Sequence, residues 1–210
     1  MPSNAYLRRL YSVYAPIYDL VIERLFAPAR RQALGALDLR PGQRVLVVGA
    51  GTGQDLNALP ADVEVTMLDL TPAMLDRGRR RAGRLGRTVA FVEGRAEALP
   101  FGDASFDAVV LHYVVAVVPE PQATIDEAAR VLRPGGRMSI LDKFAPDDGP
   151  VSRGRRALNV VTPWLATDVA RRLGPMLRAA RLVETSREKA GPFGLFRAVG
   201  VVKPESGSEA

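Results

Sequence analysis

The sequence of 210 residues predicts one α/β domain with a doubly wound, mostly parallel seven-stranded sheet that ends in an antiparallel hairpin. Residues 45–48 are a run of four apolar residues, typical of a strand buried on both faces, and three alternate glycines follow them. Further short β-rich segments alternate with helical segments, as in strands joined by crossover helices. With 47% apolar residues, the chain can bury one sizeable core.

The three glycines after the first strand are Gly49, Gly51 and Gly53. Glycine suits this turn because the loop must adopt positive φ angles and bring backbone N–H groups close to a ligand. The pattern alone does not identify the ligand, since dinucleotide, flavin and S-adenosylmethionine sites share it. A helix is expected to follow to about Leu59, where Pro60 stops it.

A second strand is expected over residues 63–69 and ends on Asp69, which lies 20 residues after Gly49. At this spacing a carboxylate at the strand tip reaches the ribose hydroxyls of an adenosine cofactor. Thr71 is expected to cap the next helix, which places Met74 on its inner face.

The remaining elements follow from apolar patterning and from proline and glycine punctuation. We expect strands over 89–92, 108–111, 137–144, 182–184 and 195–202, and helices over 121–131 and 167–180. Residues 1–204 are predicted to form the single domain, with amphipathic helices over about 5–36 and a disordered tail over 205–210.

Four ordered motifs within residues 40 to 145 resemble class I S-adenosylmethionine-dependent methyltransferases. They are the glycine loop 49–53, the segment 69–75, the run Ala-Glu-x-Leu-Pro-Phe-x-Asp-x-Ser-Phe-Asp at 96–107, and Leu-Arg-Pro-Gly-Gly at 132–136. The resemblance implies a Rossmann-like fold, with S-adenosyl-L-methionine as cofactor and S-adenosyl-L-homocysteine as product. It implies cofactor contacts from Tyr18, Gly49, Gly51, Gly53, Asp69, Leu70, Met74, Arg95, Ala96, Glu97 and His112.

Two positions depart from the family pattern. An acidic residue is common where Val47 stands, and an aspartate that accepts from the adenine amine is common where Arg95 stands. Both changes remove polar support for the cofactor. Two outcomes stay open: a modest affinity, or compensation by other groups such as the backbone around Ala96 and the stem of Arg95.

His112 follows the fourth strand at its carboxyl end, where open parallel sheets bind ligands. We predict that Tyr18 and His112 are the catalytic residues that line the approach of an amine, accept its hydrogen bond or relay its proton, with Tyr14 as a weaker candidate. A purely structural histidine is the alternative. The absence of cysteine and the single histidine exclude cysteine-ligated and multi-histidine metal centres, so no metal is expected.

Within the family, segments 14–19, 117–121, 142–144 and 194–197 resemble bacterial, Rhodobacter-type phospholipid N-methyltransferases. This resemblance implies phosphatidylethanolamine as substrate and phosphatidylcholine as end product. Quinone C-methyltransferases share the Tyr-Asp pair of the first segment, so a quinone precursor stays open, as does a non-catalytic basic module that binds nucleic acid or cofactor. No Asn/Asp-Pro-Pro-Tyr motif follows the fourth strand, so a nucleic-acid substrate is not expected.

The net charge of +6 and two basic, apolar segments at 5–26 and 150–165 predict an anionic membrane surface as partner. The residues assigned to this contact are Tyr14, Arg8, Arg9, Arg153, Arg155, Arg156 and Trp164. Either segment could instead pack on its own domain. With no apolar stretch of about 20 residues and no signal-peptide core, we expect a cytoplasmic monomer that associates peripherally with the inner membrane.

Overall fold

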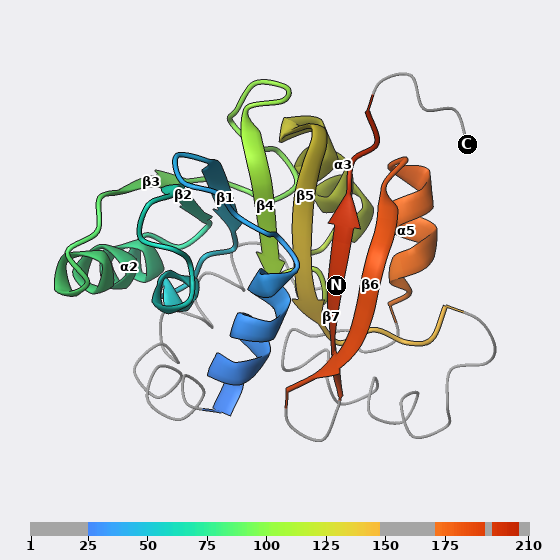
Figure 1. The fold of residues 1–210 in the computed structure, drawn as a ribbon, viewed down its shortest axis with the longest axis horizontal. Coiled ribbons are helices and arrows are strands. Elements are labelled where there is room, and N and C mark those ends of the chain that lie inside the picture. Colours follow the sequence, from blue (N-terminus) through green and yellow to red (C-terminus); the bar gives the residue numbers. More distant parts are fainter. Residues whose placement is uncertain (1–24, 148–170, 192–194, 206–210) are drawn as a thin grey trace.

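The computed structural model describes residues 25–147, 171–191 and 195–205. Its centre is a sheet of seven strands in the order β3-β2-β1-β4-β5-β7-β6 (Figure 1). The strands are β1 (Arg44–Val48), β2 (Glu64–Asp69), β3 (Val89–Glu93), β4 (Phe106–His112), β5 (Leu132–Asp142), β6 (Val183–Ala190) and β7 (Phe196–Val202). Only β7 runs antiparallel to its neighbours β5 and β6. The predicted fold class is therefore confirmed.

The apolar run of β1 lies at the middle of this sheet. Val45, Leu46, Val47 and Val48 are at most 1% exposed, and β1 pairs in parallel with β2 on one side and β4 on the other. The strand order reverses between β1 and β4, because chain connections from β1 to β3 proceed one way and those from β4 onward proceed the other. In open α/β sheets this switch point is where ligands bind.

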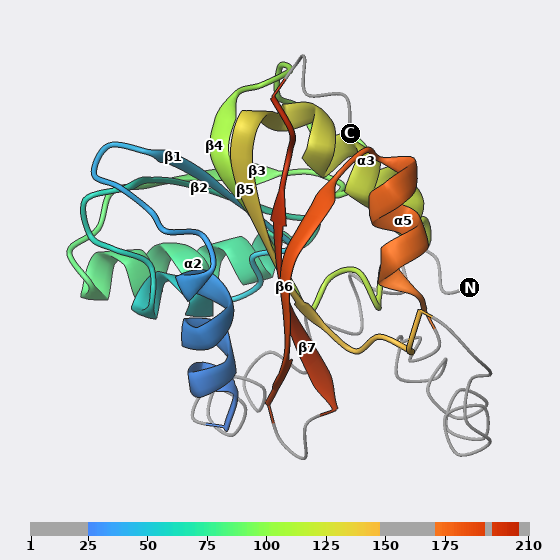
Figure 2. The same cartoon turned by 45° about the vertical axis from the view of Figure 1, so that its right-hand side comes forward.

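Helices cover both faces of the sheet (Figure 2). On one face lie α2 (Pro72–Arg84) and the helix of residues 25–35, with Leu34 and Ala82 in a shared apolar core. On the other face lie α3 (Pro121–Val131) and α5 (Leu173–Ala179), with Ile125 and Leu177 in a second core. The 25–35 helix crosses the carboxyl end of β4, so its side chains are positioned to reach the switch point (Figure 1).

Three local predictions need correction. The expected helix after Gly53 is the 3-10 helix η1 (Gln54–Asn57), whose i to i+3 bonds turn the chain tightly enough to bury Asp55. The helix expected from residue 167 begins at Leu173, and residues 171 and 172 are not helical. Thr71 precedes α2 but makes no side-chain cap bond. Its backbone N–H instead donates to Asp69.

Candidate cofactor and substrate site

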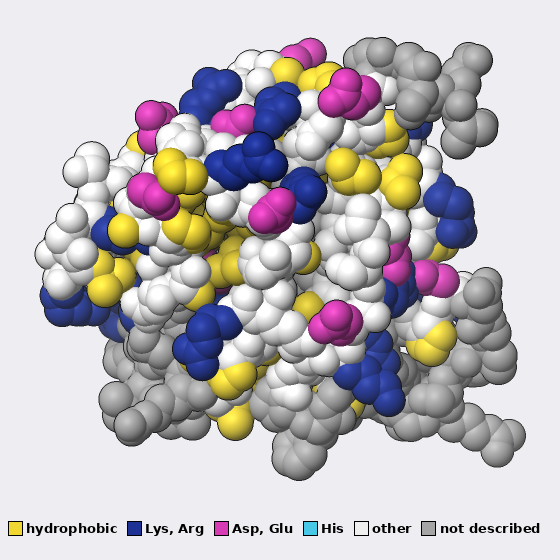
Figure 3. All heavy atoms as spheres, in the orientation of Figure 1, with side chains coloured by type: hydrophobic (Ala, Val, Ile, Leu, Met, Phe, Trp, Pro, Cys, Tyr) yellow, Lys and Arg dark blue, Asp and Glu magenta, His cyan; other side chains and the backbone are white. Residues whose placement is uncertain are grey.

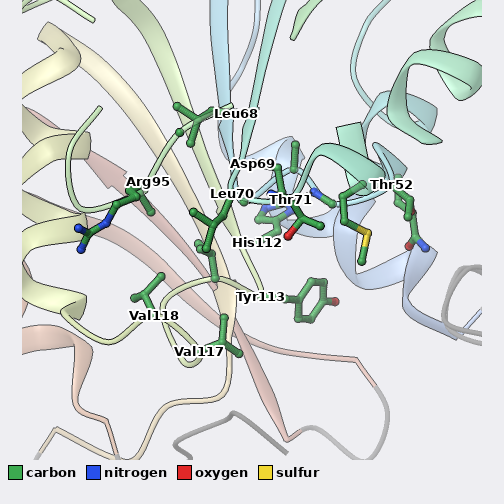
Figure 4. A pocket seen from close by; sticks show the side chains of 18 of the residues that line it. Thr52, Leu68, Asp69, Leu70, Thr71, Arg95, His112, Tyr113, Val117 and Val118 are labelled. Atoms are coloured by element: carbon green, nitrogen blue, oxygen red, sulfur yellow. Dashed lines mark hydrogen bonds between the residues drawn. The ribbon is translucent and has the colours of Figure 1, made fainter. Parts of the chain in front are cut away.

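A cavity with about 930 Å³ of empty space, its open mouth included, lies at the switch point beside the carboxyl ends of β1, β2 and β4. Figure 4 shows Asp69, Leu70 and Thr71 on one side of this space and Tyr113, Val117 and Val118 on another. The lining residues are Arg30, Gly49, Ala50, Gly51, Thr52, Gln54, Leu68, Asp69, Leu70, Thr71, Met74, Gly94, Arg95, Ala96, Glu97, His112, Tyr113, Val114, Val117 and Val118. A cavity of this size suits a small organic ligand.

The glycine loop forms one wall of the cavity. Gly49, Gly51 and Gly53 have φ angles of 63°, 54° and 77°, in the left-handed region that favours glycine. A Cβ atom on Gly49 would lie 2.7 Å from Val114 Cγ2, so the loop backbone packs directly on that side chain. Gly53 does not line the cavity. A Cβ atom there would lie 3.2 Å from Gly78 Cα in α2, so this glycine serves helix packing.

Asp69 fixes the loop to the tip of β2. Its Oδ2 accepts from the Gly51 N–H at 2.7 Å and its Oδ1 from the Thr71 N–H at 2.9 Å. Burial raises the pKa of Asp69, and the hydrogen bonds from the Gly51 and Thr71 backbones oppose that rise. The Thr71 side chain and the Leu70 backbone N–H also hydrogen-bond Asp69, so the carboxylate is held firmly at the edge of the cavity.

Glu97 is a second carboxylate on the cavity wall, near the end of β3. Its side chain is 5% exposed, and its Oε1 has no hydrogen-bond partner among the described residues. Its Oε2 lies 3.6 Å from Arg95 Nε. The Arg95 side chain is half exposed, and Figure 4 shows its guanidinium turned away from the other labelled side chains. A buried acceptor without a donor is costly unless a ligand supplies one.

The side chain of His112 sits beneath the cavity and is fully buried, at 0% exposure. Its Nδ1 lies 2.7 Å from Asp55 Oδ1 and its Nε2 lies 2.9 Å from Ser139 Oγ. Arg30 from the 25–35 helix donates to Asp55 Oδ2 at 2.7 Å. Burial raises the pKa of Asp55, but the Arg30 guanidinium and His112 outweigh it and hold that pKa well below its ordinary value.

Tyr113 lines the side of the cavity next to the 25–35 helix and is held there by neighbouring aromatic rings. Tyr113 packs edge-on against Phe26 and Phe196, with ring centroids 5.5 Å apart in each pair. The Arg30 guanidinium lies 4.7 Å from the Tyr113 ring centroid. Tyr113 has a φ of 61°, unusual for a bulky residue, and its N–H donates to the Leu141 carbonyl at 2.7 Å. Such backbone strain persists only where the surrounding structure holds it in place, and strained residues are common at binding sites.

The loop of residues 113–118 closes the cavity from below and is held by two charged side chains. Asp142, buried at the end of β5, accepts from the Ala116 N–H at 2.8 Å and from the Lys143 N–H at 2.8 Å. Arg171 donates to the carbonyls of Val115 and Val118. Burial raises the pKa of Asp142 to about 6, although the two N–H groups and the nearby cations oppose that rise.

This raised pKa predicts a pH-dependent stability. The folded protein binds the Asp142 proton more tightly than the unfolded chain, so the resulting stabilisation is complete below about pH 4 and is lost as the pH rises toward about 6. A change in pKa from 3.8 to about 6 corresponds to about 3 kcal/mol. Urea unfolding between pH 4 and 7 should therefore show wild type losing stability relative to Asp142→Asn as the pH rises. A constant difference between the two proteins would contradict the prediction.

Comparison with known proteins identifies the family. A family profile described as a methyltransferase domain matches residues 46–140. The phosphatidylethanolamine N-methyltransferase of Cereibacter sphaeroides is 38% identical over 152 residues, which cover 71% of this chain and 74% of that protein. The chain belongs to the S-adenosylmethionine-dependent methyltransferases. This outcome confirms the family resemblance seen in the sequence.

Other relatives of this methyltransferase chain differ in their described activity. The demethylmenaquinone methyltransferase of Beutenbergia cavernae is 39% identical over 143 residues, covering 68% of this chain and 57% of that protein. An uncharacterised protein of Mycobacterium tuberculosis is 40% identical over 125 residues, and the chain spans 46% of its length. The crystal structure of the [4+2]-cyclase SpnF superimposes with a TM-score of 0.79 at 18% identity, covering 98% of this chain and 97% of that one. At this identity the likeness shows the fold alone.

The residues on the cavity wall fit S-adenosylmethionine, the cofactor of this family. Asp69 lines the cavity at the tip of β2, where the carboxylate of such sites meets the ribose hydroxyls, and the buried Glu97 Oε1 needs a hydrogen-bond donor such as the adenine amine. The apolar walls formed by Leu70, Val117 and Val118 suit the flat face of a purine. No group of three or more metal-ligating side chains occurs among the described residues.

Most of the predicted cofactor residues come together in this cavity. Gly49, Gly51, Asp69, Leu70, Met74, Arg95, Ala96, Glu97 and His112 all line it. Val47, the other departure from the family, is buried within β1. Tyr18 and the residues assigned to membrane contact, from Arg8 to Tyr14 and from Arg153 to Trp164, lie outside the described residues. Sequence reasoning missed Tyr113, Val114, Val117, Val118 and the Arg30–Asp55 pair, because contacts between distant segments create these walls.

The predicted catalytic role of His112 needs revision. Its ring is inaccessible to solvent and both nitrogens already have partners in the protein. A proton relay requires a nitrogen within reach of the substrate. His112 therefore supports the site from beneath rather than meeting the reacting amine.

Proposed function

We propose that the chain transfers a methyl group from S-adenosylmethionine to the amine of a phosphatidylethanolamine headgroup. The observation that carries this proposal is the match to the Cereibacter sphaeroides enzyme, which covers more than two thirds of both chains. The aromatic and aliphatic side of the cavity formed by Tyr113, Val117 and Val118 is compatible with a lipid headgroup that enters while its tails stay outside.

The residues that line the cavity support this chemistry through positioning. The bound cofactor supplies an electrophilic methyl group on a sulfonium. Asp69 and the loop of Gly49 and Gly51 hold the donor, while the loop 113–118 excludes water from the opposite side. An in-line displacement needs mainly orientation and desolvation of a neutral nucleophile, so little acid-base machinery is required. Tyr18 remains the predicted residue at the approach of the amine.

Methylation of a quinone precursor is the second candidate. The match to demethylmenaquinone methyltransferase favours it, at nearly the same identity but over a smaller share of the relative. Both substrates are amphipathic and reside in membranes, so the cavity alone does not separate them. A cofactor-binding module without methyl transfer is the third reading, because one fold hosts several activities.

We also propose that the protein works at an anionic membrane surface. None of the described helices is both long and apolar enough to cross a bilayer. On the face in Figure 3, Lys and Arg side chains alternate with Asp and Glu rather than forming one basic patch. The proposal therefore rests on the two basic segments at 5–26 and 150–165, where each cation near anionic lipid contributes about 1 kcal/mol.

A turnover assay with labelled cofactor tests substrate and surface together. Vesicles of phosphatidylethanolamine with added phosphatidylglycerol should take up label in the lipid amine. The rate of labelling should be higher at low salt than at high salt, because salt screens the attraction between the protein and the anionic surface.

The Asp69→Ala variant should need a higher concentration of cofactor, since lost hydrogen bonds to a charged group cost about 1–3 kcal/mol. Label only in a demethylated quinol would select the second candidate. Binding of the cofactor with no label in either acceptor would favour the cofactor-binding module without methyl transfer. Rates that do not depend on salt would refute the electrostatic attachment of the protein to the membrane.

A further inference from the structure

The hydrogen bonds around His112 fix more than the orientation of its ring. The ring is fully buried, and each nitrogen lies within 2.9 Å of an oxygen atom, Asp55 Oδ1 at Nδ1 and Ser139 Oγ at Nε2. Ser139 Oγ also lies 2.8 Å from the Ala33 carbonyl oxygen in the 25–35 helix. These contacts join four residues from four different segments. Because the chemical type of each atom limits whether it can donate or accept, the positions of the hydrogens can be assigned by counting donors and acceptors.

The assignment begins at Asp55. Its carboxyl group is ionised, because the Arg30 guanidinium donates to Oδ2 at 2.7 Å and holds the pKa of Asp55 low. An ionised carboxylate can only accept a hydrogen bond. His112 Nδ1 therefore carries a hydrogen.

The second nitrogen follows from Ser139. The Ala33 carbonyl can only accept, so the single hydroxyl hydrogen of Ser139 points to it. That leaves the serine oxygen as an acceptor toward His112, and Nε2 must carry a hydrogen as well. A neutral ring that accepts from Ser139 would instead place two oxygen acceptors 2.8 Å apart with no hydrogen between them. Such a buried mismatch is strongly disfavoured.

We propose that both ring nitrogens of His112 carry a hydrogen in the folded protein, so that the ring donates two hydrogen bonds beneath the methyl-donor cavity and cannot accept a proton. It is a positioning residue: through Asp55 it holds η1, and through Ser139 it holds β5 and the Ala33 carbonyl of the 25–35 helix. These elements carry Gln54, Arg30 and the glycine loop, which line the cavity. One ring therefore joins the cofactor side to the helix that borders the substrate side.

The charge of the ring has a limited reach, because the Asp55 carboxylate lies 2.7 Å from Nδ1 and offsets it. The ring therefore does not single out the substrate amine, and the methyl donor is itself a sulfonium cation. With a hydrogen on both nitrogens the ring cannot accept a proton, so under the proposed methyl transfer the proton of the nucleophile leaves through a group other than His112.

Nuclear magnetic resonance can test the protonation state directly, because His112 is the only histidine in the sequence. In protein labelled with 15N-histidine at neutral pH, both ring nitrogens should show protonated-type shifts and bonded hydrogens. One protonated-type and one pyridine-type shift would overturn the proposal.

Substitution of Ser139 provides a second arm. In Ser139→Ala, Nε2 loses its acceptor, so we expect the ring to become neutral and Nε2 to shift to the pyridine type. If the wild-type ring is neutral already, this substitution should leave that shift in place, which again refutes the proposal. Ser105→Ala is the matched control, because the Ser105 hydroxyl bonds Gly102 in the loop before β4, outside this cluster, and should change neither nitrogen.

An assay of methyl transfer separates this proposal from the proposed function. Absence of turnover in the wild type would count against the proposed function, whereas the resonance measurement would still decide whether both ring nitrogens of His112 carry hydrogens.

Discussion

Asp55→Ala should lower the free energy of unfolding by about 3–5 kcal/mol, the usual loss when one member of a buried ion pair is removed. Asp55 is 2% exposed and is the partner of both Arg30 and the His112 ring. Removing the carboxylate leaves these groups buried without their shared anion. For a chain of this size, that loss corresponds to a melting temperature lower by about 6–20 °C.

Urea unfolding and thermal melts of Asp55→Ala and Asp76→Ala test this expectation. Asp76 pairs with Arg79 at a similar distance of 2.7 Å, but both side chains are at least half exposed, so its loss should cost about 0–1 kcal/mol. The low pKa of Asp55 adds a signature: its stabilisation is present above about pH 4 and is lost as the pH falls further. Equal destabilisation by the two substitutions would contradict the role assigned to the buried pair.

Local pattern predicted the number of strands and the bounds of the buried ones best. The strand expected over 182–184 runs over Val183–Ala190 instead, because this edge strand is mostly polar and exposed and lacks an apolar signal. Strands such as β1 and β4 are buried on both faces, so their sequences are continuous apolar runs that stand out from the flanking turns. The glycine turn and the spacing to Asp69 predicted that Gly49, Gly51 and Asp69 lie together, and they line one cavity, because both signals reflect the geometry of one strand-loop-helix unit.

The supports of the cavity were beyond local pattern. Asp55 and His112 are 57 positions apart, and Ser139 and Ala33 are 106 apart. No periodicity links such residues, and a buried aspartate in a short helix has the same local signature as an exposed one. For the same reason the sequence placed His112 at the right end of β4 but gave it a proton-transfer role that its hydrogen bonds do not allow.

The departure from the family pattern at Arg95 is accompanied by a second acidic residue nearby. The arginine side chain is half exposed, whereas Glu97, two positions later, places a buried acceptor on the cavity wall. The acidic function expected beside the adenine is therefore still present on this segment. Of the two outcomes that the sequence left open, this arrangement favours compensation over a weakened site.

Gly49→Ala should cost both stability and cofactor affinity, because two separate penalties meet at this position. A non-glycine residue at a φ of 63° costs about 1–2 kcal/mol. The new Cβ would also lie 2.7 Å from Val114 Cγ2 and 3.0 Å from Val114 Cβ, and overpacking of this kind costs about 1–3 kcal/mol. The loop can relieve both only by moving out of the cavity wall, so the affinity for S-adenosylhomocysteine should fall about tenfold or more.

Substitutions at two other glycines separate the cost of the left-handed backbone from the cost of the clash with Val114. Gly51 has a φ of 54° but no atom within 4 Å of an added Cβ, so Gly51→Ala carries the backbone cost alone. Gly83 in α2 is exposed and has neither constraint, so Gly83→Ala should be neutral or stabilising by up to about 1 kcal/mol. The expected order of stability is therefore Gly83→Ala, then Gly51→Ala, then Gly49→Ala, with calorimetric titration of S-adenosylhomocysteine as the second measurement.

A double substitution isolates the clash. Val114→Ala removes the Cγ2 atom that an added Cβ at position 49 would approach to 2.7 Å but keeps the Cβ atom at 3.0 Å. It should therefore restore part of the stability lost in Gly49→Ala and leave the backbone cost in place. A double-mutant cycle between the two positions should give a favourable coupling of about 1–3 kcal/mol. Purely additive effects would mean that the loop does not rest on Val114, and the close packing between the glycine turn and the loop 113–118 would then not be what shapes the cavity.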